Sequence, residues 1–260
     1  MLFINTRPAD RAQALTQCLV QAHFQVLDLP LLALQPLPYN AQLQQQFTQL
    51  AAVQAIVVVS PTAVEVGLAY LQRSQVKLEQ LQHIEWIAVG KKTAAVLAQH
   101  GIIASVPEVE TSEGMLQLPL FTQRPDLKAI AFWRGIGGRA FMMQQCQQKN
   151  IAVVNMLLYA RCFPESSKQQ FQTFLTMMQR EPQPFVMNIS SEASWCYWLD
   201  LCESHSDILQ KGHYLVLGRR LYQILLEDRK SKNFCFNITS LENLEENTVL
   251  QTLSLLQRSL

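Results

Sequence analysis

The stretch AIAFWRGIGGRAF, residues 129–141, joins an apolar run to a helical pattern through an arginine and three glycines. The run AIAFW has the length and composition of a strand that is buried on both faces, and the residues after Gly138 predict a helix. A strand followed at once by a helix is the building unit of α/β proteins. The segment from Gly135 to Ala140 also fits the dinucleotide fingerprint G-x-G-x-x-G/A, so we ask which anion the loop binds.

The composition of the chain limits the possible classes of protein. Its 260 residues are 49% hydrophobic and 16% charged, which is typical of a globular protein of one large or two small domains. A formal net charge of +1 provides no overall field for nucleic acid or a membrane, so an anion site must be local. The apolar runs are too short for a membrane span, and we expect no signal peptide before LFINTR (2–7). The six cysteines form no C-x-x-C pair and the five histidines no zinc motif, so we expect reduced thiols, no metal site and a cytoplasmic protein.

Short apolar runs alternate with helical patterns along the chain. Such alternation is typical of parallel sheets that are covered by helices on both faces, and it predicts an α/β fold. The predicted strands are 2–5, 24–29, 55–60, 85–89, 129–133, 152–159, 184–189, 213–217 and 233–238. The predicted helices lie near 9–22, 40–52, 62–73, 92–100, 112–118, 138–149, 166–180, 192–204, 219–229 and 242–257.

Three motifs occur twice at nearly the same offset, each at the end of a predicted strand. The pairs are Arg7 and Arg134, Ser60 and Ser190, and Gly90 and Gly218, at separations of 127, 130 and 128 positions. Three matches at one period indicate an internal duplication, and therefore two similar α/β domains with parallel sheets flanked by helices.

Two extended stretches mark the places where the chain is expected to pass between these domains. LALQPLPY (32–39) contains two prolines, and LLYARCFPE (157–165) lies in the middle of the chain. The predicted first domain is discontinuous, 1–33 plus 162–260, the second is 38–157, and the linker strands are 34–37 and 158–161.

Polar residues directly follow most of the predicted strands. In open α/β sheets, ligands collect at these carboxyl ends, where helix N-termini direct free N–H groups toward them. The candidates are Arg7, Ser60, Thr62, Gly90, Lys91, Thr93, Ser112, Arg134, Gly137, Gly138, Ser190 and Ser191. Each serine or threonine taken singly can be an ordinary helix cap. Taken together, the set predicts a ligand with several negative charges between the two domains.

The nucleotide interpretation of residues 135–140 lacks a required partner. A dinucleotide-binding unit needs an acidic residue about 20 positions further on to hold the ribose hydroxyls. The corresponding strand, AVVNMLLY (152–159), contains no acid, and the next one is Glu165. The glycines still expose N–H groups beside a helix N-terminus, which suits carboxylates or phosphates.

Seven segments, in this order, resemble the uroporphyrinogen-III synthase family. They are INTRPADRAQALTQCL (4–19), VVVSPTAVEVGLAYL (57–71), IAVGKKTAAVLAQHGI (87–102), VPEVETSEGMLQL (106–118), WRGIGGRAF (133–141), LLYARCFPE (157–165) and FVMNISSEASW (185–195). The resemblance implies a cofactor-free lyase with two α/β domains and a two-stranded linker, and since the sequence shows no strong oligomerisation signal we expect a monomer. Such enzymes remove water from the linear tetrapyrrole hydroxymethylbilane, close the macrocycle and invert ring D, which gives uroporphyrinogen III for haem biosynthesis.

The resemblance also implies roles for the candidate residues. Tyr159 matches the tyrosine of the family's linker, and its phenol can donate a proton to the departing hydroxyl. The remaining candidates would hold the eight carboxylates of the substrate through hydroxyls, N–H groups and, for Lys91 and Arg134, charge. Arg7 and Arg139 either bind a substrate carboxylate or neutralise a carboxylate of the protein.

Two other functions remain open at this point. A non-enzymatic bilobed anion-binding or sensor module explains the duplication and the cleft equally well, but it does not predict Tyr159 or the order of the motifs. A nucleotide-dependent enzyme is disfavoured by the missing ribose-binding acid.

Overall fold

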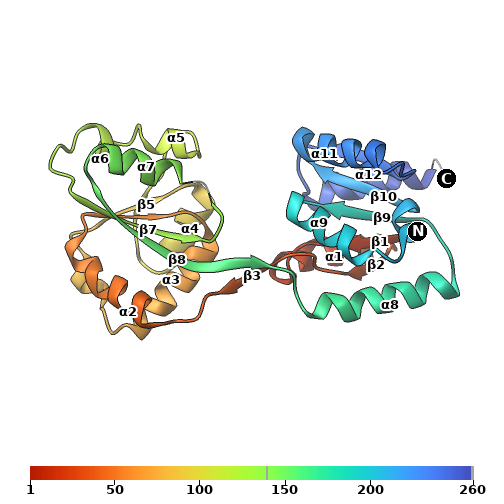
Figure 1. Cartoon of the computed structure of the whole chain (residues 1–260), viewed down its shortest axis with the longest axis horizontal. Coiled ribbons are helices and arrows are strands. Elements are labelled where there is room, and N and C mark those ends of the chain that lie inside the picture. The colour runs from red at the N-terminus through yellow and green to blue at the C-terminus, as the bar shows by residue number, and fades with distance from the viewer. Residues whose placement is uncertain (139, 259–260) are drawn as a thin grey trace. The chain divides into compact units, whose positions relative to one another are not determined.

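The computed structural model describes residues 1–138 and 140–258 (Figure 1). The chain forms two compact units, and each is described separately. Unit 1 comprises Met1–Ala33 and Cys162–Leu260, and unit 2 is the continuous segment Leu34–Arg161. The chain therefore passes from one unit to the other twice, once on each side of unit 2.

Unit 1 contains a five-stranded sheet in the order β11-β10-β9-β1-β2, and all four neighbouring pairs are parallel. The strands are β1 (Leu2–Asn5), β2 (Gln25–Asp28), β9 (Phe185–Ile189), β10 (Gly212–Leu217) and β11 (Asn237–Leu241). Alternate side chains enter opposite layers of core, because successive residues of a strand point to opposite faces. Leu2 and Ile4 pack in one layer, and Phe3 packs in the other.

Helices cover both faces of this sheet. Helices α1 (Ala9–Gln21) and α12 (Glu246–Arg258) pack against the layer that contains Phe3. The other face is covered by α8 (Ser166–Arg180), α9 (Glu192–Leu201), α10 (Ser206–Gln210) and α11 (Gly218–Ser231). Its core is rich in aromatic rings, and the indole of Trp198 donates a hydrogen bond of 2.8 Å to the fully buried hydroxyl of Tyr214.

Unit 2 contains a six-stranded sheet in the order β3-β8-β7-β4-β5-β6. The strands are β3 (Ala33–Pro36), β4 (Ala55–Val58), β5 (Glu85–Ala88), β6 (Ala104–Ser105), β7 (Ala129–Gly135) and β8 (Ala152–Cys162). The pairs from β8 to β6 are parallel, so the carboxyl ends of these strands share one edge.

Helices also cover both faces of the second sheet (Figure 1). One face packs against α2 (Ala41–Thr48), the 3₁₀ turns Gln49–Ala52 and Leu78–Leu81, α3 (Pro61–Arg73) and α4 (Lys91–Gln99). The other face packs against α5 (Ser112–Met115), α6 (Pro119–Thr122) and α7 (Phe141–Gln148). The α/β class with parallel, helix-flanked sheets is confirmed.

The two sheets have the same strand order when the sequence repeat is used to match them. The repeat pairs β1 with β7, β9 with β4 and β10 with β5. In unit 1 the order β2-β1-β9-β10-β11 then corresponds to β8-β7-β4-β5-β6 in unit 2. The extra strand of unit 2 is β3, which lies beside β8.

Some predicted elements differ from the structure. The strand predicted at 233–238 begins instead at Asn237, because Phe236 enters the core from an irregular segment and the partly buried Phe234 packs against that core. The helix predicted from residue 138 begins at Phe141, and β7 extends to Gly135. The short elements β6, α6 and α10 had no counterpart among the predictions, because two to five residues carry too little periodicity.

No disulfide joins the six cysteines in the described part of the chain, and burial raises the pKa of Cys146 to about 11, so that thiol stays protonated. Within residues 1–138 and 140–258, no helix is long and apolar enough to cross a membrane.

Gly67 on α3 provides the space for the ring of Trp133 in the core of unit 2. A Cβ at this position would lie 2.2 Å from Cε3 of the Trp133 ring, which is fully buried and cannot move aside. We expect Gly67→Ala to lower the free energy of unfolding by about 1–2 kcal/mol, because the overpacking exceeds the gain in helix propensity. Urea unfolding measures this change, with Glu65→Ala on the exposed side of α3 as the control. An equal or higher stability of Gly67→Ala would contradict the packing described here.

Candidate active site

A pocket of about 220 Å³ lies at the carboxyl-end edge of the unit 2 sheet. The described residues that line it are Val59, Ser60, Val89, Ser112, Met115, Phe132, Arg134, Gly135, Ile136, Gly138, Met142, Met143, Tyr159 and Arg161. Four predicted site residues with polar side chains thus meet here, from the N-cap of α3 and from α5, β7 and β8. The rest of the lining is mostly apolar, as is usual for small-molecule sites.

Tyr159 is fixed by its backbone, by its ring and by its hydroxyl. The N–H of Ile136 donates to its carbonyl oxygen at 2.8 Å, next to a bulge between Arg134 and Gly135 in the pairing of β7 with β8. Its ring packs over Gly135, where a Cβ would lie 2.5 Å from ring atom Cε2. The residue is only 6% exposed, and its hydroxyl lies 2.9 Å from Oγ of Ser60. The phenol is therefore held rigidly at the pocket.

Ser60 links this tyrosine to the start of helix α3. It is the N-cap residue, and its Oγ accepts a hydrogen bond of 3.1 Å from the N–H of Ala63. Pro61 follows at the first helical position, where it costs no hydrogen bond. The sequence predicted either a cap or a binding residue here, and the structure shows a cap whose oxygen also contacts the phenol.

Arg134 places a buried guanidinium in the same pocket. The residue is 7% exposed, Nη2 donates to the carbonyl oxygen of Gly138, and Nη1 lies 3.5 Å from Sδ of Met143. Among the described residues, no carboxylate forms an ion pair with it. Burial lowers the pKa of Arg134, because the charged form loses hydration, and the nearby phenol of Tyr159 opposes this effect. An anion in the pocket would offset the same loss.

Two further polar residues line the pocket. Helix α5 is capped by Thr111, whose Oγ1 accepts from the N–H of Gly114 at 3.0 Å, so the neighbouring hydroxyl of Ser112 is not needed for the cap. Arg161, which the sequence reasoning missed, contributes a second cation from an exposed position on β8. The signal was available, since Arg161 follows Tyr159 by two residues and alternate residues of a strand share a face.

The other candidates of unit 2 do not line this pocket. Gly90 and Lys91 lie at the N-terminus of α4, next to the lining residue Val89, and Thr62 is half-buried on α3. A Cβ on Gly90 would lie 2.2 Å from Oε2 of Glu110, so a protein carboxylate already lies close to that helix end. Thr93 is only 4% exposed, which leaves its hydroxyl out of reach of a ligand.

The sequence predicted that the glycines after β7 expose N–H groups to an anion, but Gly137 and Gly138 do not form a simple row of such donors. Gly137 has φ of 81°, which is left-handed backbone that glycine adopts without strain, and it does not line the pocket. Gly138 does line it, and its carbonyl oxygen faces Arg134. Arg139 lies outside the described residues.

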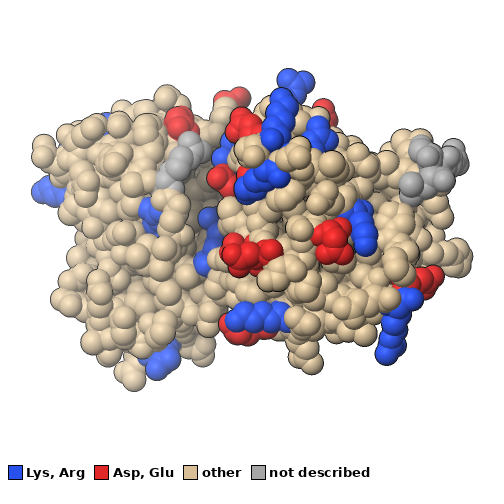
Figure 2. Space-filling view, turned by 45° about the vertical axis from the view of Figure 1, so that its right-hand side comes forward, with Lys and Arg blue, Asp and Glu red and all other residues tan. Residues whose placement is uncertain are grey.

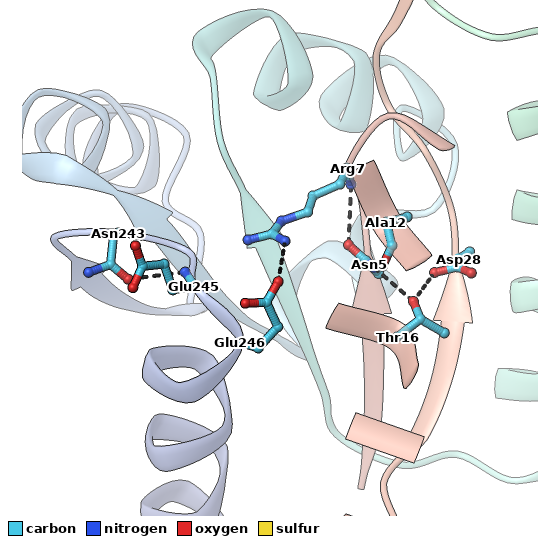
Figure 3. Close-up of polar contacts among 8 residues, drawn as sticks. All are labelled: Asn5, Arg7, Ala12, Thr16, Asp28, Asn243, Glu245 and Glu246. Carbon is cyan, nitrogen blue, oxygen red and sulfur yellow. Dashed lines mark hydrogen bonds and ion pairs between the residues drawn. The ribbon is translucent and has the colours of Figure 1, made fainter. Parts of the chain in front are cut away.

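The counterpart of Arg134 in unit 1 is Arg7, and its surroundings are different (Figure 3). Nη1 of Arg7 lies 3.8 Å from Oε1 of Glu246, the first residue of α12. Burial lowers the pKa of Arg7, and Glu246 partly opposes this effect. Of the two roles expected for Arg7, the structure contains the neutralisation of a protein carboxylate.

Side-chain hydrogen bonds also occupy the neighbouring strand end of unit 1. The Nδ2 of Asn5 donates to Thr16 at 2.9 Å, and Thr16 donates to Asp28 at 2.6 Å (Figure 3). Ser191 caps α9 by accepting from the N–H of Ser194 at 3.1 Å, and Ser190 beside it is half-buried. Both serines follow β9 directly, at the carboxyl-end edge of the unit 1 sheet, as the sequence predicted.

Charge is sparse on the face drawn in Figure 2. Lysine and arginine residues lie in small groups among aspartate and glutamate, and most of this face belongs to other residues. The observation agrees with the net charge of +1 and with few charged residues overall. This face therefore offers an anion single basic side chains and no extended basic patch.

Solved structures show the class of fold first. A mutant uroporphyrinogen III synthase from the extremely thermophilic bacterium Thermus thermophilus is 13% identical over 99% of each chain, with a TM-score of 0.61. The uroporphyrinogen-III synthetase from Helicobacter pylori is 15% identical, with a TM-score of 0.57, over 97% of this chain and 98% of that chain. At these identities the likeness establishes a shared two-domain α/β fold.

The family follows from the sequence itself. The family model described as uroporphyrinogen-III synthase HemD matches residues 13–228, well over half of the chain. The chain belongs to the uroporphyrinogen-III synthase family, and its function is that of a cyclising lyase of tetrapyrrole biosynthesis. The predicted family and function are confirmed, and a non-enzymatic anion-binding module is not favoured.

Proposed function

We propose that the unit 2 pocket is the place where hydroxymethylbilane loses its hydroxyl on the way to uroporphyrinogen III. One observation carries the proposal: a rigid phenol and a buried guanidinium that no described carboxylate neutralises line the same pocket. A proton donor beside such a cation suits a substrate that carries carboxylates and must release a hydroxyl.

Tyr159 acts as the general acid in this proposal. Its phenol donates a proton to the hydroxymethyl oxygen as the carbon–oxygen bond breaks, so that water leaves and an azafulvene cation remains. The substituted carbon of ring D then attacks this cation, and the inversion of ring D proceeds through the spiro intermediate. Completion of the macrocycle releases a proton, which restores the phenol, so the cycle needs no other reactant.

Arg134, Arg161 and Ser112 hold substrate carboxylates at this pocket. The volume of about 220 Å³ is below the range of about 300–1,000 Å³ that is usual for complete drug-sized ligands. The pocket therefore takes one part of the tetrapyrrole. The other candidates stay predictions as further contacts with the substrate: Thr62, Gly90, Lys91, Thr93, Gly137, Ser190, Ser191 and Arg7. Thr93 has little support because it is buried, and Arg7 has little because it pairs with Glu246.

The protein is proposed to act as a monomer in the cytoplasm. The proposed pocket is lined by residues of one unit of a single chain, and cysteines that form no disulfide in the described part of the chain suit a reducing compartment. Light scattering of the purified protein would report the oligomeric state.

The decisive experiment supplies freshly made hydroxymethylbilane to the purified chain and separates the products by chromatography. Spontaneous closure gives uroporphyrinogen I, so we expect the type III isomer to dominate only when the protein is present. A heat-denatured sample is the control. Exclusive formation of type I with folded protein would overturn the proposed reaction.

A further inference from the structure

The hydroxyl of Ser60 lies between a helix N-terminus and the phenol of Tyr159. Its Oγ is 3.1 Å from the N–H of Ala63 and 2.9 Å from the Tyr159 hydroxyl. In the first contact Oγ must be the acceptor, because a backbone N–H can only donate. Ser60 therefore uses one lone pair for the helix cap, and its own proton remains available for another partner.

The direction of the second hydrogen bond matters for chemistry. If Tyr159 donated to Ser60, its proton would be engaged away from the pocket. If Ser60 donates to the phenolic oxygen, the proton of Tyr159 is free for the substrate, and the same bond stabilises negative charge that develops on the phenol. The N–H of Ala63 favours this second arrangement, because a hydroxyl that accepts a hydrogen bond becomes a better donor. The positive end of the α3 dipole favours it as well.

The corresponding helix of unit 1 is capped in a different way. Helix α9 takes the place of α3 in the repeat, and its cap Ser191 lies 2.8 Å from Oγ of Ser194 on the same helix. The hydroxyl of Ser191 thus has a local partner in its own first turn. In unit 2, the cap instead reaches 99 positions along the chain to Tyr159.

We propose that Ser60 is a positioning residue, which donates to the phenolic oxygen of Tyr159 and directs the phenol's proton into the pocket. This inference rests on the proposed role of Tyr159 as the general acid. It gives Ser60 a function other than the carboxylate binding that its place at the strand end predicted. No proton is gained or lost by Ser60, because its own proton stays on Oγ throughout the cycle.

A double-mutant cycle tests the proposal. Ser60→Gly removes the hydroxyl but keeps a residue that caps helices acceptably, so the fold is retained. We expect kcat to fall about tenfold with KM unchanged, since the lost bond matters most in the transition state. In a Tyr159→Phe background, the same substitution should have no further effect on kcat. Ser60→Thr, which keeps the hydroxyl and the cap, should restore kcat to within about threefold.

The matched control is Asn40→Gly, which removes the side-chain cap of α2 in the same unit. The Oδ1 of Asn40 accepts from the N–H of Leu43 at 2.9 Å, and no predicted site residue is involved. Its kcat should equal that of the unmodified enzyme. Three results would overturn the positioning role: equal losses from Ser60→Gly in both backgrounds, a rise of KM alone, or no loss at all. Failure of the general-acid proposal is separate, since it would show as an unchanged kcat in Tyr159→Phe alone.

Discussion

Tyr159→Phe is expected to turn over hydroxymethylbilane about 10²-fold more slowly while KM stays nearly the same. The phenol donates its proton only as the carbon–oxygen bond breaks, and general acids contribute at least about this factor. The ring still packs over Gly135, so the fold is retained. A slower enzyme also lets more substrate close spontaneously, so the type I fraction should rise. Initial rates and isomer ratios measure both effects.

Tyr39→Phe provides the control for this experiment. Tyr39 belongs to the same unit, and its buried hydroxyl makes no hydrogen bond with any residue in the described part of the chain. Removal of that hydroxyl should change neither kcat nor stability appreciably. If Tyr159→Phe folded correctly and kept the full rate and isomer ratio, the assignment of the general acid would be wrong.

Arg134→Met is expected to lower kcat/KM about 10–100-fold without loss of stability. A hydrogen bond to a charged group contributes about 1.5–3 kcal/mol, which corresponds to that factor. Methionine replaces the aliphatic part of the side chain, and it removes a cation whose charged form burial disfavours. The free energy of unfolding should therefore change by less than about 1 kcal/mol. Steady-state kinetics measures the loss in kcat/KM, and urea unfolding shows whether the substitution also changes stability.

Arg124→Met is the matched control, because Arg124 is an exposed arginine of the same unit. Its Nε lies 2.9 Å from Oδ1 of Asp126, and surface pairs of this kind contribute little to stability. It should leave kcat/KM unchanged. A large loss of stability in Arg134→Met, with normal kinetics in the molecules that remain folded, would give Arg134 a structural role.

Much of the fold was predictable because its strands are short and almost wholly apolar. The prediction for LFIN (2–5) matches β1, and the one for the helix at 166–180 matches α8. The repeat carried more information, since it also predicted which strands occupy equivalent places in the two sheets. The prediction failed at 233–238, where apolar content alone indicated a strand, although Phe236 is buried in the core and Phe234 packs against it from outside the strand.

The candidate site was predicted less completely than the fold. Position at the carboxyl end of a strand selected Ser60 and Arg134, the family resemblance selected Tyr159, and the structure places all three around one pocket. It could not separate Arg134 from Arg7, because the difference depends on Glu246, a residue 239 positions away from Arg7. Nor could it show that Thr93 is buried or that the Ser60 hydroxyl contacts a phenol, since both depend on the packing of helices against the sheet.

The insertion of unit 2 into unit 1 has a consequence for synthesis on the ribosome. Strand β1 is flanked by β2 and β9, and β9 begins only at Phe185. All residues of unit 2 have been synthesised by Arg161, before β9 exists. While unit 2 is being synthesised, β1 therefore lacks its neighbour β9, and the sheet that contains residues 1–33 cannot be completed. In vectorial synthesis, residues 1–33 are made before unit 2 but belong to the unit that is completed after it.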